Sequence, residues 1–300
     1  MPYSLSDKLV IGISSRALFN LERENQIYEQ QGVEAYAAYQ REHENDPLQP
    51  GSAFPLARAL LHLNSLMPEA ERLIEVVVIS RNSPDTGMRA FNAIEQHGLD
   101  ISRAAFTGGT AVMTPYLHAF EVDLFLSRSQ EDVQLAIDSG FAAAQLVDLP
   151  AGFSAPTDQI RIAFDGDAVL FDPESEEYFQ QHGLEKFLER ENALRGLPMG
   201  RGPFAKLLIM LAELQQRFPA EQCPIRIAIV TARNSPAHAR VVHTLRNWNV
   251  SVDEAFFLGG VPKAKVLQAF GAHMFFDDQD THVRAASSVV PAGKVPHAKT

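Results

Sequence analysis

The feature that most limits the folds open to this chain is a pattern that occurs twice, about 151 positions apart. "VVISRNSP" at 77–84 and "IVTARNSP" at 229–236 end in the same four residues. A similar offset aligns "IGISSRALF" with "IAFDGDAVLF", "QQGVEAY" with "QHGLEKF" and Gly51 with Gly202. Such regular agreement predicts an internal duplication. We therefore expect two units, residues 1–150 and 151–300.

Each unit alternates short β-branched or aromatic runs with longer segments whose apolar residues recur at three and four positions. This alternation predicts an α/β fold made of two tandem Rossmann-like units, with parallel sheets flanked by helices. "DLPAGFSAPTDQ", at about 148–159, is typical of a connector between the units. The expected strands are 9–13, 76–80, 103–106 and 122–126 in the first unit, and 160–164, 226–230, 255–258 and 273–276 in the second.

Composition removes several classes of partner. The chain has 26 basic and 37 acidic residues, a formal net charge of -11 and no basic run, which argues against a nucleic acid polymer as partner. A single cysteine, Cys223, excludes an internal disulfide framework. No apolar segment approaches the length of a membrane span and the first residues lack a signal-peptide pattern. We expect a soluble, cytoplasmic protein without a membrane partner.

The two units differ where their strands end. The second has "DGD", "TAR", "GGVPK" and "DD" after its four strands, and the first has "SSR", "SRN", "GGTAVM" and "SR" at the matching places. Ligands of open α/β sheets bind beyond the carboxyl ends of the strands. Because the first unit has lost every one of the carboxylates, we expect the chemistry in the second unit and a degenerate, non-catalytic first unit.

Gathered carboxylates repel one another unless a cation lies among them. Oxygen ligands without a set of His or Cys at ligand spacing indicate Mg²⁺, and the ten histidines are interpreted as ordinary surface or core residues. One carboxylate could then attack phosphorus, while Thr231 donates a hydrogen bond to the phosphate and Lys263 adds charge at a helix start. The four carboxylates are Asp165, Asp167, Asp277 and Asp278.

The order of these motifs resembles the haloacid dehalogenase-like phosphohydrolases. The wider wording, "SSRALF", "GVEAY", "HEN", "FDGDAVLF", "VTAR", "GGVPK" and "FFDDQ", resembles the type I cytosolic 5'-nucleotidases over nearly the whole chain. This resemblance implies Mg²⁺-dependent hydrolysis of nucleoside 5'-monophosphates, with AMP as the first substrate to test. It implies that Asp165 forms an aspartyl-phosphate and that Asp167 protonates the leaving oxygen and then activates water.

The same resemblance implies that Thr231 and Lys263 hold the phosphate, with Lys265 as the alternative lysine. Asp277 and Asp278 would complete the metal site together with Asp165 and the backbone carbonyl of Asp167. Further candidates for substrate binding are Gly166, Ala232 and Arg233, the last of which fits a salt bridge equally well.

A small helical cap is expected in each unit, and in the second it spans about 172–202. Its aromatic residues fit either a platform for the base or local core, and its arginines could contact phosphate or sugar. The aromatic candidates are Phe171, Tyr178, Phe179 and Phe187, and the arginines are Arg195 and Arg201.

Several alternatives stay open. The first unit is either a scaffold or an anion pocket for a nucleotide effector, formed by Arg16, Arg81, Arg128, Gly108 and Gly109. The rival activities are another small-molecule phosphomonoesterase or phosphotransferase on the same fold, and a nucleotide-binding sensor without turnover. A homo-oligomer is also open.

Overall fold

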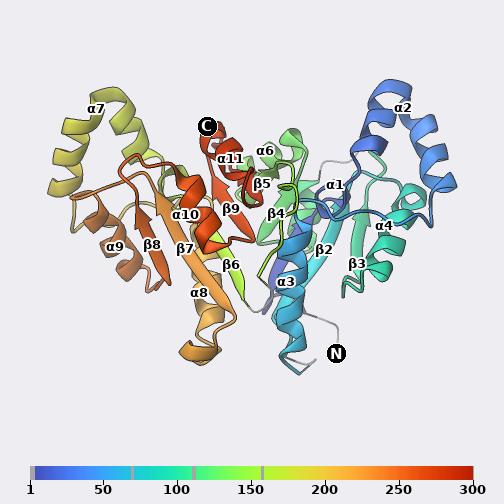
Figure 1. Cartoon of the computed structure of the whole chain (residues 1–300), viewed down its shortest axis with the longest axis horizontal. Helices are drawn as coiled ribbons and strands as arrows, with labels where there is room; N and C mark the ends of the chain where they lie inside the picture. The colour runs from blue at the N-terminus through green and yellow to red at the C-terminus, as the bar shows by residue number, and fades with distance from the viewer. Residues whose placement is uncertain (1–3, 69–70, 110–112, 157–158, 300) are drawn as a thin grey trace.

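The computed structural model describes residues 4–68, 71–109, 113–156 and 159–299, and its strands form one ten-stranded sheet (Figure 1). The strand order is β3-β2-β1-β4-β5-β10-β9-β6-β7-β8. The strands are β1 (Leu9–Ile13), β2 (Ile74–Ser80), β3 (Arg103–Phe106), β4 (Leu124–Ser127), β5 (Ala142–Leu146), β6 (Ile160–Phe164), β7 (Ile225–Thr231), β8 (Glu254–Phe257), β9 (Met274–Asp277) and β10 (Ala292–Lys294).

All neighbouring strands are parallel except β5 and β10, which meet antiparallel at the middle of the sheet. Leu146 pairs there with Gly293, and Gln145 with Lys294. A side chain at Gly293 would press on Leu146 and Ala144, so this strand contact requires glycine. The expected α/β fold with mainly parallel strands flanked by helices is confirmed, but the two halves share one sheet instead of having one sheet each.

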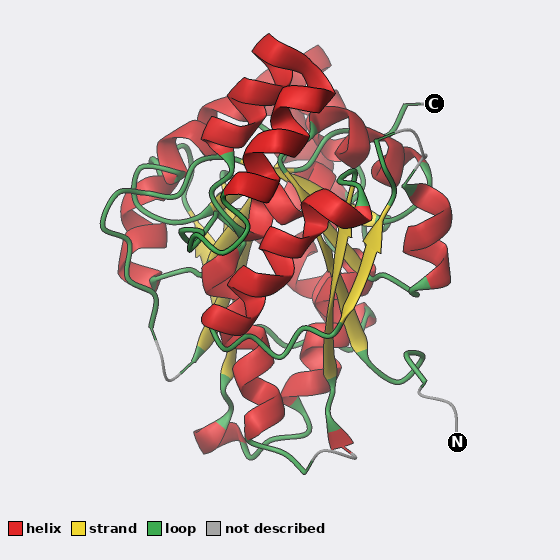
Figure 2. Cartoon of the chain, turned by 90° about the vertical axis from the view of Figure 1, so that its right-hand side faces the viewer, coloured by secondary structure: helices red, strands yellow, loops and turns green. Residues whose placement is uncertain are grey.

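Helices cover both faces of the sheet (Figure 2). They are α1 (Ser15–Leu18), α2 (Glu22–Glu42), α3 (Phe54–Ser65), α4 (Pro84–Gln96), α5 (Thr114–Ala119), α6 (Gln130–Asp138), α7 (Glu174–Ala193), α8 (Ala205–Gln215), α9 (His238–Asn247), α10 (Lys263–Phe270) and α11 (Asp280–Ala286), with single turns at Gly166–Leu170 and Ala220–Gln222. Within the described residues, no helix has both the length and the apolar character needed to cross a bilayer.

The eight predicted strands lie at or within two residues of their expected ranges, and β5 and β10 were not predicted. All seven residues of β2, "IEVVVIS", are buried, as expected for a strand covered on both faces. One hydrophobic cluster runs from β1 in the first half to α8 and β9 in the second, so the halves also share a core. In the predicted connector, residues 148–156 form no helix or strand, and residues 157–158 lie outside the described residues.

Each half carries a helical insert between its first two strands, α2 in one and α7 in the other, at opposite outer corners of Figure 1. Each insert bends at a glycine with positive φ, Gly32 (84°) and Gly183 (77°). Single β-bridges close both stems, Phe19 with Pro50 and Phe171 with Arg201. The helix expected within 172–202 is confirmed.

A glycine follows each bridge because the returning chain passes very close to the turn after the first strand. A side chain at Gly202 would overlap the carbonyl oxygens of Val169 and Phe171, and one at Gly51 would overlap that of Ala17. The stems therefore fix each insert beside the carboxyl end of the first strand in its half.

Candidate active site

Asp165 lies directly after β6, at the carboxyl end of a central strand of the second half. Its side chain accepts a hydrogen bond of 2.7 Å from the N–H of Gly166, and the residue is only 5% exposed. The chain then turns sharply, with Ala168 in the left-handed region at φ 59°. This turn leaves Asp165 at the bottom of the site and brings Asp167 to its partly exposed rim.

Lys263 joins the first carboxylate to the end of β9. Its Nζ lies 2.9 Å from Oδ1 of Asp165 and 2.7 Å from Oδ2 of Asp277. Burial alone would lower the pKa of Lys263, but the two carboxylates outweigh it and raise the pKa, so the ammonium stays charged. Lys265, two residues further along α10, is exposed. The structure therefore places Lys263, rather than Lys265, in the site.

The site holds more negative charge than its lysine neutralises. Burial raises the pKa of Asp165 to about 7 against the opposing effect of Lys263, and the charge of Asp277 adds to the rise. Burial and the neighbouring Asp277 raise the pKa of Asp278 to about 6. Carboxylates that are buried close together in this way suit a divalent cation, which would reduce the repulsion between their negative charges.

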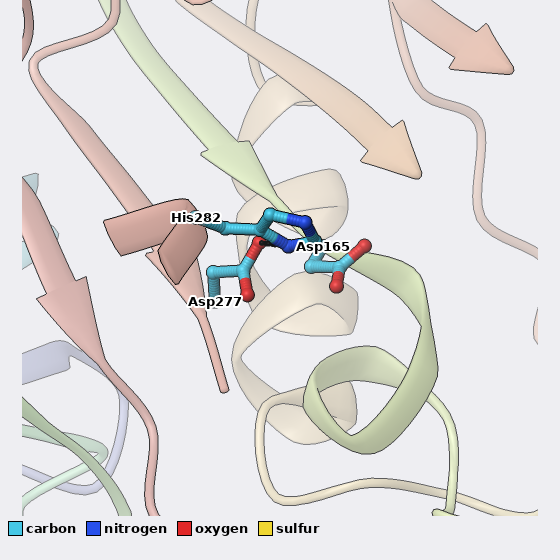
Figure 3. Close-up of side chains that lie close together, drawn as sticks. All are labelled: Asp165, Asp277 and His282. Atoms are coloured by element: carbon cyan, nitrogen blue, oxygen red, sulfur yellow. Dashed lines mark ion pairs between the residues drawn. The ribbon is translucent and has the colours of Figure 1, made fainter. Parts of the chain in front are cut away.

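His282 is a member of this group that the sequence interpretation missed. Ligand atoms of Asp165, Asp277 and His282 all lie within 4.8 Å of one another, and their side chains point toward one another in Figure 3. The contact with Asp277, 3.3 Å from Nδ1, raises the pKa of His282. A second histidine, His297, lies 3.1 Å from Asp278. His282 therefore differs from the ordinary surface or core histidine that we expected, whereas His297 is exposed.

Thr231 ends β7 beside β6 and is 1% exposed. Its hydroxyl oxygen accepts a hydrogen bond of 3.2 Å from the N–H of Arg233, and it lies next to the space above Gly166. Ala232, between them, is exposed. The structure thus brings together residues at the carboxyl ends of β6, β7 and β9 and at the start of α10. They are Asp165 and Asp167, Thr231 and Arg233, Asp277 and Asp278, and Lys263.

Arg233 forms a salt bridge with the second aspartate of "DGD". Its Nε and Nη2 donate to the two carboxylate oxygens of Asp167 over 2.8 and 2.6 Å. Its Nη1 donates to Glu191 of the α7 insert, which is 0% exposed. Of the two roles open for Arg233, the structure contains the salt bridge.

Glu191 also holds the insert to α9. Its Oε1 accepts hydrogen bonds from Arg240 (2.8 Å) and from the hydroxyl of Ser175 (2.9 Å). Arg240 in turn donates to the carbonyl oxygen of Leu197, in the loop that follows α7. A buried carboxylate with these partners keeps its charge compensated, and it links the insert to Arg233 and so to Asp167.

The sequence contains a signal for this network. At the offset of 151, Glu191 aligns with Gln40, Arg240 with Arg89 and Ser175 with Glu24. In the first half Arg89 donates to both Glu24 and Gln40. The buried carboxylate that pairs with this arginine is Glu24 in the first half and Glu191 in the second, and these two positions do not align. Only Glu191 also accepts a hydrogen bond from a second arginine, Arg233.

The other candidate substrate residues of the second half fall into two groups. Phe171 is 0% exposed and packs against Trp248 with ring centroids 5.6 Å apart, so it lies in the core and offers no free face for stacking. Phe187 is also buried and lies under the guanidinium of Arg233. The exposed or half-buried candidates are Tyr178, Phe179, Arg195 and Arg201, of which Arg201 lies over the ring of Trp248.

Carboxylates hold all three candidate arginines of the first half. Arg16 pairs with Glu22 at 2.9 Å, Arg81 pairs with Asp132 and Glu131, and Arg128 pairs with Asp148 at 2.7 Å. Their charges are therefore compensated within the chain.

Comparison with known proteins agrees with the motifs at this site. A family model described as 5'-nucleotidase matches residues 1–300. The human protein named cytosolic 5'-nucleotidase 1B is 39% identical over 294 residues, which are 95% of this chain and 48% of the human protein. The chain thus spans about half the length of this relative, and no solved structure gave a significant match. The chain belongs to the 5'-nucleotidase family.

Proposed function

We propose that this protein is a Mg²⁺-dependent 5'-nucleotidase that hydrolyses nucleoside 5'-monophosphates, with AMP as the first candidate. The observation that carries the proposal is the buried pair of Asp165 and Asp277 joined by Lys263, at the carboxyl ends of β6 and β9. A carboxylate held in place beside a fixed positive charge is suited to attack a phosphate ester. Family membership and the name of the human relative support the same substrate class.

In the proposed reaction an oxygen of Asp165 attacks phosphorus, and the bond from phosphorus to the ribose 5'-oxygen breaks. Asp167, protonated at this stage, gives its proton to that oxygen. Water then attacks phosphorus of the aspartyl-phosphate while Asp167 accepts a proton from it, which releases phosphate, frees the carboxylate of Asp165 and returns Asp167 to its protonated form. Since both oxygens of Asp167 accept hydrogen bonds from Arg233, Asp167 must exchange one of these bonds for the leaving oxygen.

The chain's own residues would bind the phosphate from several sides. Thr231 supplies a hydroxyl, Ala232 offers a backbone N–H group nearby, and Lys263 supplies a charge. The N–H of Gly166 donates to Asp165 and would exchange that bond for a phosphate oxygen. Arg195 and Arg201 are exposed on the α7 insert, where they could reach the rest of the nucleotide. Phe179 is 38% exposed, and we propose it, in place of Phe171, as the platform for the base. The ring of Tyr178 is already stacked on His182 and lies under the guanidinium of Arg190.

We propose that Asp165, Asp277 and Asp278 hold the Mg²⁺, with the backbone carbonyl of Asp167. The support is the buried site itself, where burial and, to a lesser extent, the neighbouring Asp277 raise the pKa of Asp165 and of Asp278. When bound, Mg²⁺ neutralises phosphate oxygens and makes phosphorus a better electrophile.

We further infer that residues 1–150 and 151–300 descend from one duplicated unit and that only the second is catalytic. The support is the order of the strands, 3-2-1-4-5 in the first half and 8-7-6-9-10 in the second, together with the matching stems at Gly51 and Gly202. The name of the human relative favours the cytosol as the place of action.

A substrate panel tests this function. We expect turnover of nucleoside monophosphates, faster than that of sugar phosphates and p-nitrophenyl phosphate, and only with Mg²⁺. Preference for a sugar phosphate would favour another phosphomonoesterase, transfer of the phosphoryl group to an added alcohol would favour a phosphotransferase, and no turnover would favour a nucleotide sensor.

Asp165→Asn tests the nucleophile. It keeps the size of the side chain but removes the attacking oxygen, so we expect kcat to fall by several orders of magnitude with an unchanged circular dichroism spectrum. Asp100→Asn is the matched control, since Asp100 pairs with Arg72 on the surface of the first half. Near-normal turnover by Asp165→Asn would exclude covalent catalysis at this residue.

A further inference from the structure

The first half contains a cavity of about 370 Å³ at the carboxyl ends of β1, β2 and β4. This place corresponds to that of the candidate active site in the second half. Its volume lies near the lower end of the range of about 300–1,000 Å³ in which proteins bind small molecules. Its lining is hydroxyl-rich on the side of the strands, with Ser14, Ser80 and Ser127. On the side of α2 it is mainly apolar or aromatic, with Glu24 and Asn25 also present.

The lining argues against a metal or a phosphate as the occupant. Ser14 and Ser127 stand where the other half has Asp165 and Asp277, so the carboxylates that would bind a cation are absent from these positions. The three arginines at the cavity, Arg16, Arg81 and Arg128, are already paired with carboxylates. An anion would have to compete with those carboxylates, so the lining favours an uncharged ligand.

One hydrogen-bond donor of the lining is held in a fixed orientation. Arg89 donates to Gln40 (3.1 Å), Gln40 donates to the hydroxyl of Tyr36 (2.9 Å), and Tyr36 donates to Oδ1 of Asn82 (3.1 Å). This chain of donors begins at a buried guanidinium and determines which end of the Asn82 amide accepts. Nδ2 of Asn82 is consequently left as a donor.

That donor is buried and lacks a protein partner among the described residues. Buried polar groups are rarely left without a partner in native proteins. Asn82 lines the cavity, so a ligand with a carbonyl oxygen or an unprotonated ring nitrogen would satisfy it.

The α2 side of the cavity offers surfaces for a flat ring. Tyr28 and Tyr36 meet edge to face, with ring centroids 5.9 Å apart. Tyr28 is 50% exposed and Val33 is 63% exposed, so apolar groups at the cavity lie open to solvent. A planar ligand could bury this apolar surface on binding.

We propose that this cavity binds an uncharged nucleoside. A ring acceptor of the base bonds to Nδ2 of Asn82, the base packs on Tyr28 and Tyr36, and the ribose hydroxyls meet the serines at the strand ends. This site is additional to the proposed hydrolysis in the second half, and binding there does not require that the second half be an active nucleotidase.

Isothermal titration calorimetry on the full chain tests the site, with Asp165→Asn as background so that added monophosphates persist. The probes are adenosine, guanosine, cytidine and uridine, their 5'-monophosphates and inorganic phosphate. We expect at least one nucleoside to bind, and Asn82→Ala to weaken that binding about tenfold or more because the donor is lost. Asn92→Ala is the matched control, since its amide donates to the carbonyl of Glu44 and lies outside the lining.

Tyr36→Phe provides a second variant that keeps the ring and removes the hydroxyl that orients Asn82. We expect weaker nucleoside binding, while the KM of the wild-type background for nucleoside monophosphates stays unchanged by either substitution. Absence of binding by every nucleoside would overturn the proposal, as would binding that survives both substitutions. Binding of inorganic phosphate that is lost in Arg16→Ala would identify an anion site instead.

Discussion

Glu191 offers the sharpest test of how the α7 insert acts on the candidate active site. It is 0% exposed and accepts hydrogen bonds from Arg233 and Arg240, whose side chains are 2% and 6% exposed. In Glu191→Gln the shape is kept, but the negative charge is lost and an NH₂ group faces a guanidinium. Breaking a buried ion pair on one side costs about 3–5 kcal/mol, since the remaining charge stays buried without compensation.

We expect a second effect on the reaction itself. Arg233 holds both oxygens of Asp167, so an arginine without its anchor would let that carboxylate shift. A displacement of about 1 Å can reduce a rate about 10²-fold. We therefore expect kcat of Glu191→Gln to fall by about that factor, measured on protein shown to be folded.

Glu24→Gln is the matched control. Glu24 pairs with Arg89 in the first half at 2.7 Å, and both side chains are 6% exposed, so the loss of stability should be similar. Because this pair lies in the other half, kcat should remain within about twofold of wild type. Urea denaturation and steady-state kinetics on both variants give the result. Equal losses of kcat would refute a positioning role for Glu191, and an unchanged denaturation midpoint would refute the energetic argument.

Three further outcomes follow from the same contacts. Lys263→Met should leave Asp165 and Asp277 without the ammonium group that lies between them. We expect the free energy of unfolding to fall by about 3–5 kcal/mol and turnover to be abolished. Urea denaturation and steady-state kinetics measure these two effects. Added Mg²⁺ should raise the thermal midpoint of the wild type by binding only the folded state, and Asp277→Asn should remove this rise in differential scanning calorimetry. Gly202→Ala should lower the thermal midpoint, because its methyl group would overlap the carbonyl oxygen of Phe171, and a midpoint equal to wild type would contradict the close approach.

The strands were predictable where hydrophobicity and β-branching coincide, as in "IEVVVIS" of β2 and "IRIAIVT" of β7. β5 and β10 escaped prediction. β5 is "AAAQL", and alanine has low β-propensity, while β10 is only the three residues "AGK". Their pairing with each other is a contact between distant segments, which local pattern does not encode.

The sequence predicted those site residues that lie at the carboxyl ends of parallel strands, because these ends meet at one edge of the sheet. Asp165, Thr231 and Asp277 end or follow neighbouring strands, and that topology alone makes them converge. His282 was missed because a search for close histidine pairs does not detect a lone histidine on the helix after Asp277. Phe171 stayed open between the core and a base platform because an aromatic residue after a tight turn can face inward or outward, and its packing against Trp248 favours the core.

The antiparallel contact between β5 and β10 gives the first half a structural role, although it lacks the four carboxylates of the candidate active site. Each of these strands covers the open backbone edge of the other. If either half were removed, the remaining one would expose unpaired N–H and C=O groups along its flank, and such flanks recruit strands from other molecules. An isolated second half would therefore be expected to self-associate through the exposed edge of β10.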